Sequence, residues 1–189
     1  MPLDTFNQRK KDVLSRQDQS FKGSWDKKIS KLCEKINSLE NYYTTSSCSG
    51  RILLMIDQEK KAEGLFKWMS HDLITFNEQK KAIQKLEKLR KNIKFKQEPC
   101  ILHIACKTLK DANHFLELGF KAGLKKSGIL YFGSRIIVEL NASEKLEFPI
   151  IVNGKLIVDD NFLKIVVKKA NENLENGWEK IKKLEKLVN

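Results

Sequence analysis

The segment with the most side chains suited to chemistry is residues 44–51. Gly50 and Arg51 follow an unbroken run of hydroxyl and thiol side chains, Thr44-Thr45-Ser46-Ser47-Cys48-Ser49. Hydroxyls and exposed backbone N–H groups in a turn can hold a phosphate, a carboxylate or a ribose, and the guanidinium of Arg51 adds a bidentate donor for an anion. The alternative is a polar turn whose side chains only cap the backbone. We favour a binding site, because the run leads directly into a predicted buried strand.

Other titratable side chains are candidates for the same chemistry. Lys22 and Asp26 lie on either side of Gly23, where a ligand can approach the backbone closely; the alternative is a turn between helices, capped by Asp26. His103 lies within an apolar run, where an imidazole is costly unless it is hydrogen-bonded. It is therefore either a hydrogen-bonded core residue or a base at a sheet edge. His71 follows a predicted strand.

The overall charge favours a polyanionic partner. Lys and Arg number 36 against 24 Asp and Glu, which gives a net charge of +12. RNA, DNA and acidic membrane surfaces are the candidates, and solvated lysines are the alternative. The loop Lys125-Lys126-Ser127-Gly128 could bind phosphate or be a solvated turn. The lysines of 79–96 and 164–186 are expected on solvated helix faces.

Composition and cysteine spacing exclude several classes. The 189 residues, 41% of them hydrophobic, suffice for a core, so we expect one domain over 1–189. No apolar run approaches the ~18–20 residues of a membrane span, and no signal peptide is expected. The four cysteines form no C-x-x-C pair, so no metal site is predicted. Cys33, Cys100 and Cys106 are expected to be reduced core residues, as in a cytoplasmic protein.

The hydrophobic pattern predicts the elements that position these residues. Helices are expected over 3–17, 26–39, 78–91 (capped by Asn77), 109–121 (capped by Thr108, with Gly123 past its end) and from 159 onward. Strands are expected at Ile52–Ile56, Leu65–Met69, Ile101–Cys106, Ile129–Phe132, Ile136–Leu140, Pro149–Val152 and Lys155–Val158, the last two joined by an Asn153-Gly154 hairpin. Residues 41–50 are expected to form turns.

This order of elements predicts an α+β fold, a mixed β-sheet covered by helices. No G-x-G-x-x-G follows a strand and no P-loop pattern occurs, so the fold is expected to be non-Rossmann.

Over nearly its whole length the sequence resembles the tRNA wybutosine-synthesizing protein 3 family. The matching patterns are Asp18-x-Ser20-x-Lys22-Gly23-x-x-Asp26, the segment from Tyr43 to Arg51, Trp68-Met69-Ser70-His71, Glu98-Pro99-x-x-Leu102-His103, Ala122-Gly123-x-x-x-Ser127-Gly128-Ile129, and Pro149, Gly154-Lys155-Leu156 and Ala170-Asn171. The segment from Thr44 to Arg51 is the most specific of them.

The resemblance implies a methyltransferase that depends on S-adenosylmethionine. It would methylate the N4 ring nitrogen of a wyosine-type guanine beside the anticodon of tRNA-Phe. The alternatives are a non-catalytic basic RNA-binding module and an enzyme whose serine-rich loop binds a phosphorylated metabolite.

The implied reaction suggests roles for the candidate residues. The ring nitrogen must lose a proton, for which Asp26 and His103 are the leading candidates and His71 is a weaker one. Ser47 is grouped with them, and we expect it to converge with His103 on one pocket. The expected substrate- or cofactor-binding residues are Lys22, Thr45, Ser46, Ser49, Arg51, His71, Ser127 and Gly128. Tyr43, Trp25 and Trp68 are candidates to stack on the tricyclic base.

Overall fold

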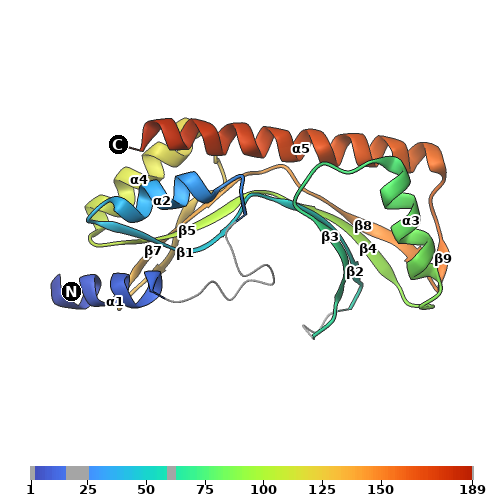
Figure 1. Ribbon diagram of the computed structural model, residues 1–189, viewed down its shortest axis with the longest axis horizontal. Helices are drawn as coiled ribbons and strands as arrows, with labels where there is room; N and C mark the ends of the chain where they lie inside the picture. Colours follow the sequence, from blue (N-terminus) through green and yellow to red (C-terminus); the bar gives the residue numbers. More distant parts are fainter. Residues whose placement is uncertain (1–2, 16–25, 59–62, 189) are drawn as a thin grey trace. The chain divides into compact units, whose positions relative to one another are not determined.

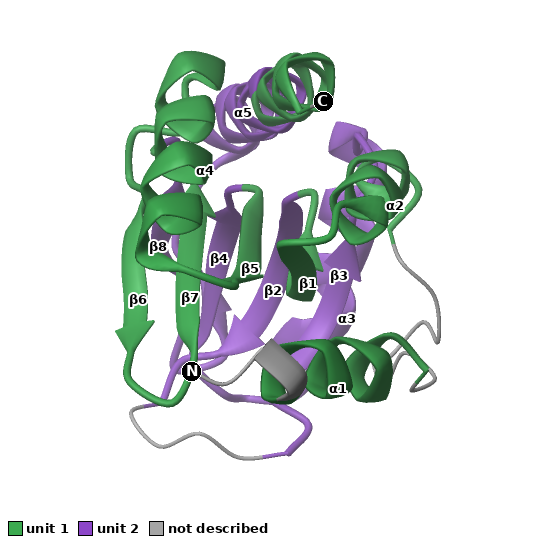
Figure 2. Cartoon of the chain, turned by 90° about the vertical axis from the view of Figure 1, so that its left-hand side faces the viewer, with its two compact units in different colours: residues 1–49, 100–143, 177–189 green, residues 50–99, 144–176 purple. Residues whose placement is uncertain are grey.

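The computed structural model describes residues 3–15, 26–58 and 63–188 (Figure 1). The chain forms two compact units (Figure 2). Unit 1 comprises Met1–Ser49, Cys100–Ser143 and Gly177–Asn189, and unit 2 comprises Gly50–Pro99 and Glu144–Asn176. Both units lie within the span predicted to be one domain. Among the described residues, no helix combines the length and apolarity needed to span a membrane.

Unit 1 is built on a four-stranded antiparallel sheet. In spatial order its strands are β1 (Tyr42–Cys48), β5 (Ile101–Cys106), β7 (Ile136–Asn141) and β6 (Gly128–Phe132). Its helices are α1 (Leu3–Leu14), α2 (Ser30–Ser38), α4 (Leu109–Ala122) and the C-terminal part of α5 (Asp160–Leu187).

The two faces of this sheet pack against different helices. Alternation along β5 sends Leu102 and Ile104 into the main core with α2, α4 and the end of α5. The opposite face carries Ala105, which packs in a smaller cluster with Tyr43 and with Phe6 of α1. We call these the α2/α4 face and the α1 face.

Unit 2 is built on a second antiparallel sheet. In spatial order its strands are β3 (Phe66–Ser70), β2 (Arg51–Ile56), β4 (Ile93–Glu98), β8 (Leu146–Val152) and β9 (Lys155–Leu156). Its helices are α3 (Phe76–Glu87) and residues 160–176 of α5. Phe148 of β8 stacks on Phe95 of β4 at 5.2 Å between ring centroids and meets Phe162 of α5 edge-on at 5.6 Å. The amide of Asn173 donates to buried Gln97 at 2.7 Å, which joins α5 to the sheet.

The α+β class is confirmed, but the strands form two antiparallel sheets instead of one mixed sheet. Two strands were missed. β1 lies where turns were expected, because its hydroxyl side chains lack the apolar alternation of a half-buried strand. β4 lies where Lys94 and Lys96 suggested a solvated surface, whereas their ammonium groups form ion pairs on one face of the sheet.

Local signals for helix ends and turns were more reliable. The Thr108 cap of α4 and the left-handed Gly123 after it (φ 96°) are confirmed. The Asn153-Gly154 hairpin is also confirmed, with φ values of 50° and 75°. The predicted Asn77 cap is wrong: α3 is capped by Thr75 in a capping box with Glu78. On the same helix, the side chain of Ile83 is fully buried.

Replacing Thr108 by Ala should destabilise the protein by about 1 kcal/mol, because the side chain accepts a hydrogen bond from Asp111 N at the start of α4. Chemical denaturation measures the loss. Thr108→Ser, which keeps the hydroxyl, should retain most of the stability. Equal destabilisation by both changes would show that the hydroxyl does not cap the helix.

Candidate functional site

The hydroxyl-rich run forms strand β1, and a bulge at Thr45 decides which way each side chain points. The register between β1 and β5 shifts between Thr44 and Ser46, so Ser46 pairs with His103 and Ser47 pairs with Leu102. Residues paired across two strands share a face. Ser46 therefore lies on the α1 face with His103, and Ser47 lies on the α2/α4 face.

On the α1 face, polar residues form a row across the sheet. His103 pairs with Ser46 on one side and Glu139 on the other, and Glu139 pairs in turn with Gly128. The imidazole Nε2 lies 2.9 Å from Glu139 Oε2, with 24% and 26% of the two side chains exposed. An imidazole held by a carboxylate and still reached by solvent has the arrangement of an oriented general base.

Ser47 has a different environment. Its hydroxyl forms a hydrogen bond with the buried thiol of Cys33 on α2. Burial raises the pKa of Cys33 to about 11, so the thiol stays protonated at neutral pH. The expected convergence of Ser47 and His103 on one pocket is therefore wrong: they lie on neighbouring strands but on opposite faces of the sheet.

Asp26 and Ser49 form a second polar pair in unit 1. The Asp26 carboxylate accepts a hydrogen bond from the Ser49 hydroxyl and another from Ser49 N at 3.3 Å. Ser49 is fully buried, so this pair fixes the end of β1 against the segment before α2. The N-cap residue of α2 is Ile29, and Asp26 caps the turn before it: Asp26 Oδ1 accepts a hydrogen bond from Lys28 N at 3.3 Å, and Asp26 O accepts one from Ser30 N at 3.1 Å.

Ser127 and Gly128 lie where β6 begins. The Ser127 hydroxyl donates to Leu124 O at 2.6 Å and accepts from Asn141 N at 3.1 Å, so it stabilises the turn. A Cβ at Gly128 would meet nothing within 4 Å. The row containing His103 therefore ends beside open space.

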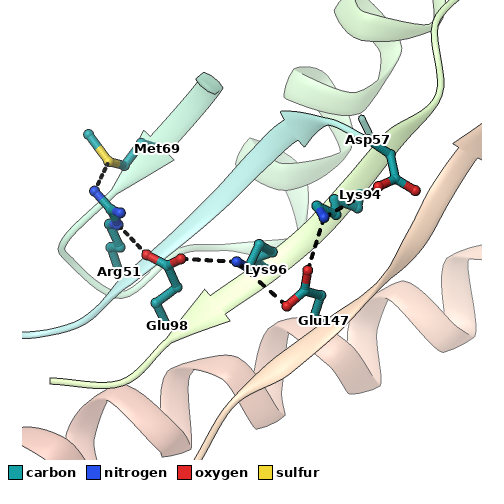
Figure 3. Close-up of polar contacts among 7 residues, drawn as sticks. All are labelled: Arg51, Asp57, Met69, Lys94, Lys96, Glu98 and Glu147. Atoms are coloured by element: carbon teal, nitrogen blue, oxygen red, sulfur yellow. Dashed lines mark hydrogen bonds and ion pairs between the residues drawn. The ribbon is translucent and has the colours of Figure 1, made fainter. Parts of the chain in front are cut away.

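Arg51 belongs to unit 2, where an ion-pair ladder crosses three strands (Figure 3). Its Nε lies 2.6 Å from Glu98 Oε2, its Nη1 lies 3.6 Å from Met69 Sδ, and its guanidinium lies 5.1 Å from the Phe66 ring centre. The guanidinium is thus held in place by contacts on several sides.

The ladder continues from Glu98 through neighbouring lysines. Lys96 bridges Glu98 and Glu147 at 3.1 and 3.5 Å, and Lys94 bridges Glu147 and Asp57 at 3.0 and 3.3 Å (Figure 3). Burial raises the pKa of Glu98, but Arg51 and Lys96 outweigh burial and hold this pKa below its ordinary value. Glu98 is therefore ionised at neutral pH.

The remaining predicted residues differ in unit and exposure. His71 follows β3 in unit 2 and is partly exposed, as is Trp68 on β3. Lys22 and Trp25 lie outside the described residues. Tyr43 is 1% exposed and packs on Phe6 at 5.2 Å between ring centroids, so it is not available to stack on a base.

Sequence reasoning assigned no role to two carboxylates, Glu139 and Glu98, although Glu98 stands in one of the matching family patterns. Glu139 is the one charged residue within the apolar strand Ile136–Asn141, a signal that could have been noticed. Glu98 lies at the end of a strand that was not predicted. The sequence did not reveal that Glu139 contacts His103 or that Glu98 contacts Arg51, because strand register decides which residues pair.

Comparison with protein families matches residues 8–189 to the family described as Methyltransferase TYW3. A relative from Pyrococcus horikoshii, tRNA(Phe) 7-((3-amino-3-carboxypropyl)-4-demethylwyosine(37)-N(4))-methyltransferase 1, is 34% identical over 98% of this chain and 96% of its own. A relative from Methanocaldococcus jannaschii has the same name without the final 1. It is 35% identical over 92% of this chain and 92% of its own. The tRNA wybutosine-synthesizing protein 3 homolog of Danio rerio is 32% identical over 97% of this chain and 74% of its own.

A solved structure shares the fold. The PH1069 protein from Pyrococcus horikoshii superposes with a TM-score of 0.89 at 32% identity, covering 99% of this chain and 97% of the other.

Glu98→Gln should reduce the fall in the free energy of unfolding between neutral and acidic pH. The folded-state pKa of Glu98 lies below the ordinary 4.5, so its stabilising contribution is fully present above that pH. The contribution is lost as the pH falls through the lowered folded-state pKa. Chemical denaturation from neutral pH to below pH 4.5 should therefore show a smaller loss for Glu98→Gln than for the wild type.

The control is Glu117→Gln, at an exposed position of α4, which should follow the wild-type profile. If Glu98→Gln also follows the wild-type profile, the ladder does not contribute to the loss of stability at acidic pH.

Proposed function

Because the chain belongs to the Methyltransferase TYW3 family, we propose that it methylates the N4 ring nitrogen of a wyosine-type guanine in tRNA-Phe. The observation that carries the proposal is the near full-length match to relatives named for this reaction, 34% to 37% identical. The chain is a methyltransferase, as its family is. The proposed substrate is the 7-(3-amino-3-carboxypropyl)-4-demethylwyosine nucleotide of the relatives' names, and the net charge of +12 suits a tRNA. A cytoplasmic location stays a prediction.

We assign S-adenosylmethionine as the methyl donor; when bound, it supplies an electrophilic methyl group. The α1 face of unit 1 offers groups that fit it. The hydroxyls of Thr45 and Ser46 are exposed and suit a ribose or a carboxylate. Glu139 supplies negative charge that suits a cationic sulfonium, and open space lies beside Gly128 at the end of the same row.

His103 is the proposed proton acceptor, and Glu139 is its positioning residue. The carboxylate holds Nε2 at 2.9 Å, and among the described residues Nδ1 has no hydrogen-bond partner. Transfer would break the methyl–sulfur bond of the donor, which would leave as a neutral thioether, while N4 gains the methyl group and Nδ1 of His103 takes the proton released from N4–H. Asp26 is the weaker candidate, because its carboxylate already accepts two hydrogen bonds from Ser49.

The remaining roles follow from chemistry and exposure. Arg51 is the proposed anion-binding residue, because Glu98, Met69 and Phe66 hold its guanidinium in place. Lys22 and His71 remain proposed binding residues. Ser47 and Ser49 are proposed to support β1, since their hydroxyls bond to Cys33 and Asp26.

The reaction is tested by incubating the protein with S-adenosylmethionine and tRNA-Phe that carries the demethylated nucleoside. Nucleoside mass spectrometry should show the gain of one methyl group on that nucleoside. tRNA-Phe with unmodified guanine at the same position is the control and should gain none. Binding of both tRNAs without any methylation would favour the non-catalytic RNA-binding module.

His103→Gln should lower kcat by about 100- to 10 000-fold, the usual contribution of a general base. The KM for tRNA should change little. Glu139→Gln should cause a smaller loss, because the imidazole stays in place but is less firmly oriented. Methyl-transfer kinetics at varied tRNA concentration measure kcat and KM for both variants.

The comparison variant is Asp26→Asn, chosen to keep the side-chain shape. Full activity in His103→Gln together with a loss of turnover in Asp26→Asn would transfer the role of base to Asp26.

A further inference from the structure

Strand β6 exposes more apolar surface than an edge strand usually does. It lies at the edge of the unit 1 sheet beside β7 (Figure 2). Leu130 is 56% exposed, Tyr131 47% and Phe132 68%. Exposed edge strands invite pairing with other molecules unless charges protect them, so a run of this kind indicates a contact surface.

Positive charge surrounds this strand. Lys125 and Lys126 precede it and Arg135 follows it, and all three are exposed. Arg9 of α1 reaches the same turn, because its Nη1 donates to Ser134 O at 2.6 Å. The cations therefore come from both ends of β6 and from a separate helix.

Arg9 and Arg135 line a hollow on the α1 face. Its volume is about 340 Å³, and its lining residues are Arg9, Asp12, Val13, Tyr43, Ser134 and Arg135. Burial raises the pKa of the Tyr43 hydroxyl, and both arginines oppose that shift, as expected for two guanidinium groups close to the phenol. A hollow with two arginines and one carboxylate favours an anion.

Tyr131 brings an aromatic ring to the turn that supplies Ser134 and Arg135 to the hollow. It pairs with Ile137, so it lies on the α1 face. Its hydroxyl would lie 2.7 Å from a Cβ at Gly133. The ring therefore extends over the turn that leads into Ser134 and Arg135.

We propose that Tyr131 and the Arg9–Arg135 hollow bind one unpaired nucleotide of the RNA substrate, with its base on the ring and its phosphate at the arginines. The inference rests on the proposed function for its RNA. Aromatic rings next to cations are the usual means of binding single-stranded nucleic acid. A second copy of the chain fits less well, because like charges would meet along paired edges and each copy carries +12.

Affinity for tRNA-Phe tests the ring. Tyr131→Ala should weaken binding about 5- to 100-fold, the usual effect of losing one stacking contact, while Tyr131→Phe should bind as the wild type does. The matched control is Phe120→Ala on α4, a residue 49% exposed in the same unit, and it should not change the affinity. Because stacking is made equally before and during methyl transfer, Tyr131→Ala should raise KM and leave kcat near wild type.

The salt dependence of tRNA binding tests whether Arg135 contacts a phosphate. Arg135→Ala should reduce the slope of log affinity against log salt by about 1. Lys121→Ala removes another exposed charge, on α4, and should leave the slope unchanged.

The outcomes separate this inference from the proposed function. If the wild type methylates tRNA and Tyr131→Ala binds as tightly as Phe120→Ala, the inference fails alone. If the wild type neither binds nor methylates tRNA, the proposed function fails with it. A wild-type dimer in size-exclusion chromatography that Tyr131→Ala converts to monomer would make β6 a protein interface and overturn the inference.

Discussion

The antiparallel pairing of β1 with β5 is the constraint on which the rest of unit 1 depends. One extra residue, Thr45, bulges out of the ladder, and a bulge changes which face the following residues occupy. It places Ser46 beside His103 and turns Ser47 towards Cys33. The same ladder thus divides the run between two faces of the sheet, one shared with His103 and the other packed against α2.

The basic residues are divided in a similar way. In unit 2, Lys94 and Lys96 form ion pairs with Glu147 on the neighbouring strand, Lys96 also pairs with Glu98 on its own strand, and Glu98 holds Arg51 in turn. In unit 1, Arg135 and the lysines before β6 remain exposed. The ladder pairs three cations with three carboxylates, so the excess that gives the net charge of +12 lies outside it. Composition alone gives only the total.

The fold performs its chemistry without the glycine-rich phosphate loop of a dinucleotide-binding sheet. Methyl transfer requires an aligned nucleophile more than it requires a reactive side chain, so positioning supplies much of the rate. Antiparallel strands suit that task, because paired residues on one face lie at fixed spacing. The row of Ser46, His103 and Glu139 uses this property to hold an imidazole from one strand with a carboxylate from the next.

The sequence alone determined the features that depend on local chemistry. These include the Thr108 cap, the left-handed Gly123, the Asn153-Gly154 turn, the apolar strands and the family motif from Thr44 to Arg51. Each of them depends on residues only a few positions apart. Tertiary structure decided that β1 and β4 are strands, since their polar side chains are stabilised by partners far along the chain. It also decided that His103 meets Glu139 and not Ser47, because strand register depends on pairing between distant segments.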